Sequence, residues 1–285
     1  MRKLIALLMI VMLVAGMAFA TGCGEKEQLT VTEGVLTVSV SPDFAPMEFV
    51  DTSKSGQEQY VGVDIELAKA IAAEMGCQLL IKPMSFEACQ TALQSGIVDM
   101  SISGYVETEE RAQKYLLSDY YQPRFTDSAQ RVLVKADDVS KYKTAEDFAG
   151  ISVGAQAASL QQDLCKKQLP ESTEIVEYAE LEKAVVALEE GKIQAIAAAE
   201  YFGDTAIVAN SNLAFADFIF ELTDTEEKNV VLLPKGRDDL AVYVNKVIKE
   251  ITENGELSRW YDEAVTLSES ITAENISYDD EGEEI

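Results

Sequence analysis

Short strand-like segments alternate with helix-like segments twice along this chain. In the first series, residues 35–40 alternate apolar and polar side chains and are rich in β-branched residues, which predicts a strand. Apolar residues at helical spacing predict a helix over 63–75, and Gly76 follows as a stop signal. The remaining elements of this series are two strands and a short helix, predicted at 78–82, 98–102 and 86–93. Such an alternation is typical of a mostly parallel sheet covered by helices.

The same alternation restarts near residue 131. Strands are predicted at 131–134, 151–154, 175–176 and 194–197, and helical segments at 145–148, 160–168 and 181–190. A β-rich piece at 230–233 then leads to a long helix over 240–251. Two α/β series, each of about 100 residues, predict two lobes.

The first 22 residues have the organisation of a secretory signal. Arg2 and Lys3 precede an apolar run over 4–20, and small residues follow. The run is close to the lower limit of a membrane-spanning helix, about 17 residues. An uncleaved anchor is therefore the alternative to a cleaved signal peptide at 1–22.

Charge and residue usage exclude several classes of function. The chain carries 23 Lys+Arg against 50 Asp+Glu, a net charge of −27, so it lacks the basic surface that nucleic-acid binding requires. Histidine is absent, which removes Ser-His-Asp and Cys-His nucleophile systems and all histidine metal sites. We expect no nucleic-acid partner, no metal and no cofactor.

The four cysteines lack the CxxC spacing of zinc and redox sites. Cys77, Cys89 and Cys165 are expected to be small buried apolar residues, with a Cys77–Cys89 disulfide as the alternative. From Asp279 onward the chain is almost entirely acidic, so we expect the end of the tail at 269–285 to be disordered.

Ligands of parallel α/β sheets bind at the carboxyl ends of the strands. We therefore expect the functional residues in the loops that follow the predicted strands. These loops are 41–49, 83–86, 103–111, 155–159 and 198–201.

Arg111 is the sharpest candidate in these loops. Thr108 is a good helix N-cap, which places Arg111 at the third helical position, against the positive end of the helix dipole. A cation is unfavourable there unless it points into a cleft and binds an anion, and the guanidinium fork matches a carboxylate. An exposed arginine paired with Glu107 or Glu110 is the alternative.

Two aromatic residues and one serine are further candidates. Phe44 and Phe86 would lie at neighbouring strand tips and stack on a ligand, or else pack in the core. Ser159 precedes a helix whose free N–H groups attract an anion, or it is a plain N-cap.

Several stretches, in this order, resemble extracellular solute-binding family 3, the polar amino-acid-binding proteins of ABC importers. The resemblance extends over nearly all of 34–268 and implies an α/β, two-lobe clamp of the periplasmic-binding-protein-like type II. Two hinge strands would join the lobes near 121–127 and 222–229. Lobe 1 would comprise 34–121 and 228–268, and lobe 2 would comprise 125–223. The matching stretches are 41–46, 61–68, 92–99, 104–111, 118–121, 244–245 and 254–255.

The resemblance also assigns roles to single residues. In such proteins the arginine that matches Arg111 binds the α-carboxylate of the ligand, helped by backbone N–H groups at Val106 and Ser159. The aromatic residues that match Phe44 and Phe86 pack on the ligand side chain. The carbonyl group of Gly104 takes part in holding the α-ammonium group. No catalytic residue is implied.

The sequence departs from the family pattern at three positions. Val106 stands where a Ser or Thr hydroxyl is usual, Ala199 where an Asp usually pairs with the ammonium, and Ser41 where members with cationic or amide ligands often carry Asp. A buried ammonium without a partner costs several kcal/mol. Either Glu200 or Asp43 therefore takes over that task, or the ligand is not a standard α-amino acid. We expect a small carboxylate, in first place an amino acid with a neutral or apolar side chain.

Residues 20–23 resemble the lipobox of bacterial lipoproteins, with Ala20 where leucine is usual. The resemblance implies cleavage before Cys23 and a lipid on its thiol, with 23–33 as a tether. It predicts a monomeric receptor on the outer face of the cytoplasmic membrane. This receptor would deliver its ligand to the membrane permease of an ABC importer.

Two alternatives belong to other functional classes. Some secreted proteins of this fold resemble cyclohexadienyl dehydratases, and Glu200 in an apolar cleft would serve as general acid. The departures at Val106 and Ala199 also fit a ligand-sensing domain with a degenerate site.

Overall fold

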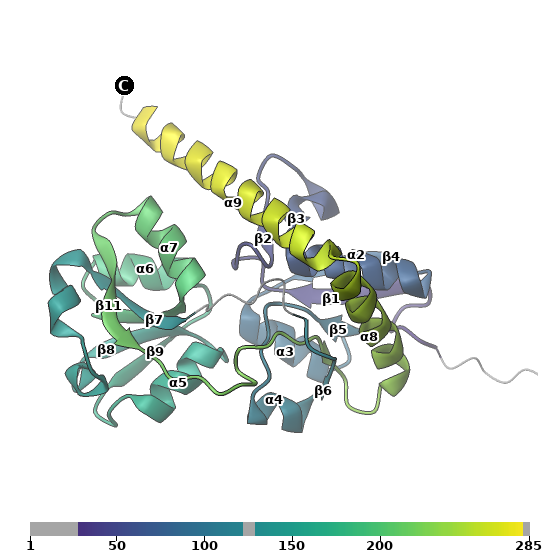
Figure 1. Cartoon of the computed structure of the whole chain (residues 1–285), viewed down its shortest axis with the longest axis horizontal. Helices are drawn as coiled ribbons and strands as arrows, with labels where there is room; N and C mark the ends of the chain where they lie inside the picture. The colour runs from purple at the N-terminus through teal and green to yellow at the C-terminus, as the bar shows by residue number, and fades with distance from the viewer. Residues whose placement is uncertain (1–27, 122–128, 282–285) are drawn as a thin grey trace, which may run out of the picture.

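The computed structural model describes residues 28–121 and 129–281, which form two lobes side by side (Figure 1). Each lobe contains a five-stranded sheet with helices on its faces. The expected α/β, two-lobe architecture is therefore confirmed. The expected signal peptide and Cys23 lie outside the described residues, as does all of the expected first crossover 121–127 except Tyr121.

The sheet of lobe 1 has the strand order β4-β1-β5-β12-β6. The central strand β1 is parallel to β4 and β5, whereas β12 is antiparallel to β5 and β6. A short antiparallel pair, β2 with β3, precedes the first long helix. The strands of lobe 1 are β1 (Val35–Val40), β2 (Phe49–Val50), β3 (Tyr60–Val61), β4 (Gln78–Pro83), β5 (Met100–Ser101), β6 (Leu116–Leu117) and β12 (Leu232–Leu233).

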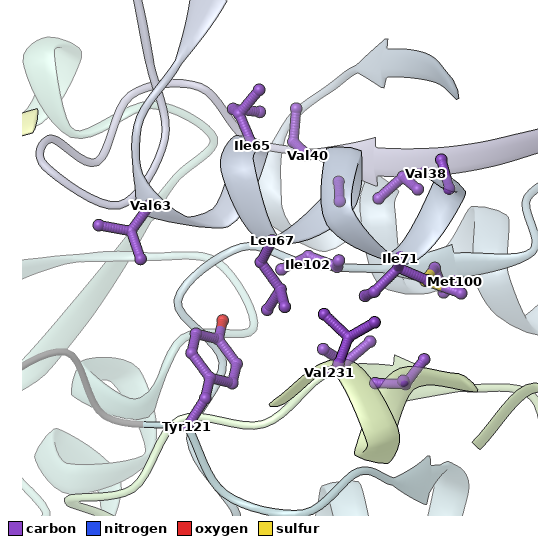
Figure 2. Packing of buried hydrophobic residues seen from close by; sticks show 14 of the residues in the cluster. Val38, Val40, Val63, Ile65, Leu67, Ile71, Met100, Ile102, Tyr121 and Val231 are labelled. Atoms are coloured by element: carbon purple, nitrogen blue, oxygen red, sulfur yellow. The ribbon is translucent and has the colours of Figure 1, made fainter. Parts of the chain in front are cut away.

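Apolar faces of β1 and of the first long helix form the core of lobe 1 (Figure 2). Val38 is paired with Ile81 on β4 and with Met100 on β5, and all three side chains are buried. The helix ends where predicted because Gly76 adopts a left-handed conformation, with φ 66°, and its N–H bonds the carbonyl groups of the last turn. The helices of this lobe are η1 (Gly56–Gln59), α2 (Val63–Met75), α3 (Phe86–Gln94), α4 (Glu109–Lys114), α8 (Asp238–Glu253) and α9 (Glu256–Glu281).

The sheet of lobe 2 has the strand order β11-β7-β10-β8-β9. Strands β8, β9 and β10 run parallel, and β7 pairs antiparallel with both β10 and β11. Separate apolar clusters cover its two faces. Its elements are β7 (Gln130–Lys135), η2 (Ala136–Lys141), η3 (Ala145–Phe148), β8 (Ser152–Gln156), α5 (Leu160–Gln168), β9 (Glu174–Tyr178), α6 (Leu181–Glu189), β10 (Ala195–Ala199), α7 (Glu200–Ala209) and β11 (Leu213–Ile219).

The chain returns from lobe 2 to lobe 1 along residues 220–231. Tyr121 donates a backbone hydrogen bond to Asn229, and Val230 donates one to Tyr105, so the returning segment is bound to the outgoing side of lobe 1. The returning segment therefore lies beside Tyr121, the last described residue before the chain leaves lobe 1.

The end of the chain differs from the expected tail. Helix α9 continues to Glu281, so the first three residues of the segment expected to be disordered from Asp279 are helical. The reason is that Leu257, Trp260 and Ala264 recur at helical spacing and pack on the core of lobe 1, which stabilises the helix from its first turns. Figure 1 shows α9 crossing toward lobe 2.

The three cysteines within the described residues are free thiols, so the alternative Cys77–Cys89 disulfide is absent. Cys89 and Cys165 are buried as expected, whereas Cys77 is only partly buried. Burial raises the pKa of the Cys89 and Cys165 thiols to about 12. They are inert, apolar packing residues. None of the helices in the described part of the chain combines the length and apolar character needed to cross a bilayer.

Candidate functional site

A cleft of about 530 Å³ lies between the two lobes. All five predicted loops contribute to its wall. Six of the residues predicted from the sequence line it, namely Phe44, Phe86, Gly104, Val106, Arg111 and Ser159. The structure therefore brings together side chains that are far apart in the chain.

Arg111 is buried at the wall of this cleft, with 5% of its surface exposed. The Thr108 hydroxyl caps helix α4 and accepts a hydrogen bond from the Arg111 backbone N–H at 3.2 Å. The guanidinium group donates from Nη1 to the Val106 carbonyl at 2.9 Å and from Nη2 to the Ala158 carbonyl at 3.2 Å. Its Cζ atom lies 5.6 Å from the centre of the Phe86 ring.

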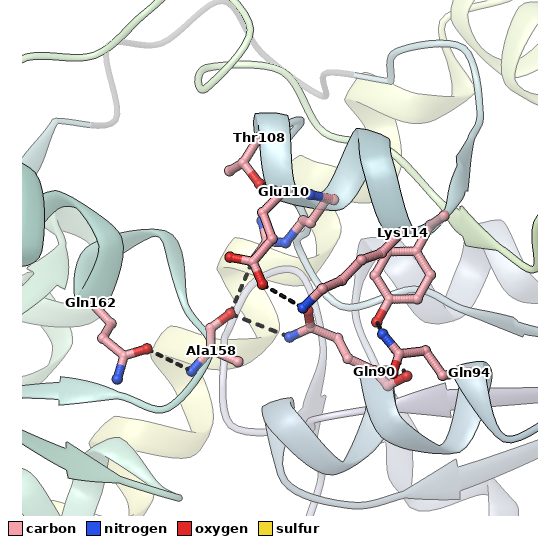
Figure 3. A network of polar contacts seen from close by, with 9 residues as sticks. Gln90, Gln94, Thr108, Glu110, Lys114, Ala158 and Gln162 are labelled. Carbon is pink, nitrogen blue, oxygen red and sulfur yellow. Dashed lines mark hydrogen bonds and ion pairs between the residues drawn. The ribbon is translucent and has the colours of Figure 1, made fainter.

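The surface-pair alternative for Arg111 is wrong. Glu110 pairs with Lys114, as Figure 3 shows, and Glu107 accepts a hydrogen bond from Tyr120. Within the described ranges, no carboxylate forms an ion pair with Arg111. Burial lowers the pKa of Arg111 from its ordinary value, yet a guanidinium remains protonated in proteins. A buried cation that contacts only neutral oxygen atoms is suited to an anionic ligand.

Two aromatic rings flank the cleft on the side of lobe 1. Phe44 follows β1 and Phe86 follows β4, and these strands are neighbours in the sheet. The Phe86 ring packs against Tyr105 with centroids 4.8 Å apart. Gly104 has φ +55°, and a Cβ atom there would lie 3.1 Å from the Phe44 ring, so glycine lets the loop approach that ring closely.

The opposite wall is the loop between β8 and α5. Ser159 is the N-cap of α5, and its hydroxyl accepts a hydrogen bond from the backbone N–H of Gln162 at 3.1 Å. Ala158 has φ 59°, a left-handed conformation that is rare for a residue with a side chain. Its carbonyl oxygen faces lobe 1 and also accepts a hydrogen bond from Gln90 Nε2 at 3.3 Å (Figure 3).

Two predicted site residues do not line the cleft. Glu200 begins α7 and forms an ion pair with Arg131 of the adjacent strand β7, with Oε1 and Nη1 2.9 Å apart. This partner holds the carboxylate away from the cleft, whereas the neighbouring residues Ala199 and Tyr201 reach the wall. Ser41 is buried behind the wall and donates a hydrogen bond from Oγ to Asp43 Oδ1 at 2.9 Å.

Asp43 is one of two acidic residues of the first loop that line the cleft, and Glu48 is the other. Gln156 of lobe 2 donates from Nε2 to Asp43 Oδ2 at 3.1 Å, so this contact also joins the lobes. Burial raises the pKa of Asp43 to about 6, against the lowering effect of the hydrogen bond from Ser41. Asp43 is thus poorly solvated when it is charged and gains from a cationic ligand.

Several residues of the wall were not predicted from the sequence. Glu48 and Gln156 lie in predicted loops but carried no distinguishing pattern. Tyr201 and Tyr261 also line the cleft, and Tyr261 comes from α9, far along the chain from every predicted loop. Only the packing of α9 brings it there. In the described part of the chain, no group of three or more acidic or cysteine side chains could hold a metal ion.

Comparison with known proteins shows the same architecture elsewhere. Residues 36–266 match the model of the bacterial extracellular solute-binding proteins, family 3. A curated relative, the arginine-binding extracellular protein ArtP of Bacillus subtilis, is 28% identical over 88% of this chain and 94% of its own length. The L-cystine-binding protein TcyJ of Escherichia coli is 26% identical over 93% of this chain and 97% of its own.

A solved structure is also similar. It is the amino acid ABC transporter substrate-binding protein AbpA from Streptococcus pneumoniae, bound to L-arginine. The TM-score is 0.73 and the identity 34%, over 82% of this chain and 96% of that chain.

Proposed function

This chain belongs to family 3 of the bacterial extracellular solute-binding proteins, and we propose that it is the substrate-binding protein of an ABC importer for a small amino acid. The ligand would lie in the cleft, held through Arg111, while the two lobes close over it. Rotation of two lobes about adjacent connections is a common way to enclose a ligand.

The observation that carries this proposal is the buried guanidinium group of Arg111. It lies at the wall of the cleft and contacts the neutral carbonyl oxygens of Val106 and Ala158. A carboxylate would offer it two parallel hydrogen bonds and a full negative charge. The α-carboxylate of an amino acid supplies that group, and the backbone at Val106 and Ser159 would assist.

Asp43 is our candidate for holding the ammonium group of the ligand. Ala199 provides no charge on the wall of lobe 2, and Glu200 is paired with Arg131. Asp43 lines the cleft and is largely desolvated, so a cation beside it would be bound tightly. The carbonyl group of Gly104 would complete this subsite.

We propose a neutral or apolar side chain for the ligand. The wall offers Phe44, Phe86, Val106 and Ala199, which favour apolar contact. A cationic side chain is the second candidate, because the exposed Glu227 also lines the cleft and two of the similar proteins named above are described with arginine.

The alternatives of other classes have less support. A dehydratase would need a general acid in the cleft, and Glu200 does not line it. A degenerate ligand-sensing domain would not need a buried cation at the cleft wall, because such a cation is costly without an anionic ligand.

We further propose that the mature protein is a monomer, held on the outer face of the cytoplasmic membrane by lipid on Cys23. Mass spectrometry of the N-terminal peptide would detect cleavage before Cys23 and the added lipid. A Cys23→Ser variant recovered in the membrane fraction as fully as the wild type would contradict this anchor.

The ligand is tested by isothermal titration and thermal shift against the twenty amino acids and simple carboxylic acids. We expect one or a few amino acids with neutral side chains to bind. A ligand at 100 times its Kd stabilises by about 2.7 kcal/mol, which raises Tm measurably. Preference for arginine or lysine would favour the second candidate, and the absence of any stabilising ligand would contradict the importer function.

A further inference from the structure

Two carboxyl groups, those of Glu48 and Asp64, interact directly in the interior of lobe 1, beside the wall of the cleft. Glu48 precedes β2, Asp64 lies in the first turn of α2, and each has 0% of its surface exposed. Glu48 also contributes to the wall of the cleft. The proposed amino-acid binding assigns no role to either group.

Asp64 is hydrogen bonded at both oxygens. Its Oδ2 accepts from the backbone N–H of Gly104 at 2.7 Å, and its Oδ1 accepts from the hydroxyl of Tyr121 at 2.7 Å. Gly104 belongs to the wall of the cleft, and Tyr121 is the last described residue before the chain leaves lobe 1. Asp64 therefore ties the binding loop to the start of the crossover.

Glu48 has a different pattern. Its Oε1 accepts a hydrogen bond from Ser103 Oγ at 2.5 Å, while its Oε2 is buried without a hydrogen-bond partner. An ionised carboxylate oxygen that is buried without a hydrogen-bond donor loses its hydration and has no protein contact that replaces it. A protonated Oε2 would instead be a donor, with the neighbouring carboxylate of Asp64 as its acceptor.

The surroundings of the pair disfavour two negative charges. Asp43 adds a third acidic group from the first loop, and the other titratable groups that face Glu48 are neutral, namely Tyr105, Tyr121 and Cys89. No cation forms an ion pair with Glu48 or Asp64 in the part of the chain that the structure covers. Burial and then the charge of Asp64 raise the pKa of Glu48 well above its ordinary value. Two carboxyl groups that share such a site hold a proton between them.

We propose that Glu48 is protonated and donates a hydrogen bond from Oε2 to Asp64, so that one proton held by this pair positions Gly104 and Tyr121. Glu48 is then a positioning residue, which acts on the cleft and the crossover through Asp64. Loss of the proton would place two like charges together and weaken both hydrogen bonds to Asp64.

The pH dependence of this arrangement has a definite sign. The folded state keeps a proton on Glu48 at pH values where the unfolded chain has lost it, so the folded state binds more protons. The contribution of Glu48 to stability is therefore greatest below the ordinary pKa of a glutamate and is lost as the pH rises toward the folded-state pKa.

The test compares Glu48→Gln with the wild type, and uses Glu58→Gln, an exposed glutamate of η1, as the matched control. The amide that replaces the Glu48 carboxyl group is neutral and can still donate to Asp64. We expect that Glu48→Gln folds and that its unfolding free energy falls less between about pH 6 and about pH 9 than that of the wild type and of Glu58→Gln. An unchanged slope in Glu48→Gln would contradict the proposal.

A second measurement does not depend on the variant folding. Infrared spectra of wild-type protein at about pH 8 should contain the C=O stretch of a protonated carboxylic acid, and this band should shift when only glutamate is labelled with ¹³C. A band that does not shift, or no band at all, would show that Glu48 is ionised. Both measurements are made without ligand, so failure to bind an amino acid would leave their result unaffected.

Discussion

The Nη2 atom of Arg111 donates a hydrogen bond of 3.2 Å to the carbonyl oxygen of Ala158 and so joins lobe 1 to lobe 2 inside the cleft. The same carbonyl accepts from Gln90 of lobe 1, and Gln156 of lobe 2 donates to Asp43. The proposed carboxylate-binding group is thus also a contact between the lobes. Ligand binding and lobe closure would be coupled through one side chain.

Replacing Arg111 by lysine should weaken ligand binding. Lysine keeps the charge but cannot form two parallel hydrogen bonds to a carboxylate. We expect the Kd of the best ligand to rise about 30-fold, equivalent to about 2 kcal/mol, in isothermal titration. The control is Arg259→Lys, which should bind as the wild type does. Arg259 is a half-exposed residue of α9 that pairs with Glu263. Equal Kd values for both variants would place the carboxylate elsewhere.

Replacing Ala158 by glycine should stabilise the protein. The left-handed conformation of Ala158, with φ 59°, costs about 1–2 kcal/mol for a residue with a side chain, and glycine adopts it freely. After the extra chain entropy of glycine is subtracted, we expect a gain of about 0.5–1 kcal/mol, seen as a Tm about 2 °C higher.

Ala157→Gly is the matched control, because Ala157 is buried beside it and is not in the left-handed region. It should lower Tm. If both glycine variants lowered Tm equally, the conformation of Ala158 would carry no strain.

Much of the fold could be predicted because the local sequence pattern of a segment and its packing in the folded chain favour the same structure. Helix α2 begins and ends as predicted, since its apolar spacing and Gly76 specify both its buried face and its end. The apolar run 98–102 predicted a strand of five residues, but β5 consists only of Met100–Ser101. The strand is short because its partners β1 and β12 pair with it over few residues. The length of a strand is set by its neighbours, which a local pattern does not contain.

The candidate site was predictable where a residue conflicts with its local environment. Arg111 opposes the dipole of its own helix, and this conflict pointed to the cleft. Glu200 gave a misleading indication, because its ion pair with Arg131 depends on the pairing of β7 with β10. Tyr261 reaches the wall only through the packing of α9, so no local pattern could have indicated it.

Ligand affinity should fall in acid because of Asp43. The pKa of Asp43 is raised to about 6 by burial, so its negative charge is present above that pH and is lost below it. If Asp43 holds the ligand ammonium, we expect the Kd to rise about tenfold between pH 7 and pH 5. Asp43→Asn should bind more weakly at pH 7 and show little change over this range. A wild-type Kd independent of pH would exclude Asp43 as the counter-charge.

The contact between α9 and lobe 2 should be measurable by a double-mutant cycle. Tyr201 Oη of α7 and Ser268 Oγ of α9 are 3.1 Å apart, and both side chains are at least partly buried. For Tyr201→Phe and Ser268→Ala we expect a coupling energy of about 0.5–1.5 kcal/mol in denaturant unfolding. Additive effects would mean that α9 does not hold the two lobes together at this point.

Replacing Gly203 by alanine should destabilise lobe 2. A Cβ atom at Gly203 would lie 2.2 Å from Cε1 and Cζ of Phe215. The Cζ atom of Arg131 lies 4.2 Å from the centre of the same ring. The ring must move, so we expect a loss of about 1–3 kcal/mol and a Tm lower by several degrees. Thr205→Ala, at an exposed position of the same helix, controls for helix propensity and should leave Tm nearly unchanged. If Gly203→Ala kept the wild-type Tm, the close approach of α7 to the Phe215 ring would not be needed for the stability of lobe 2.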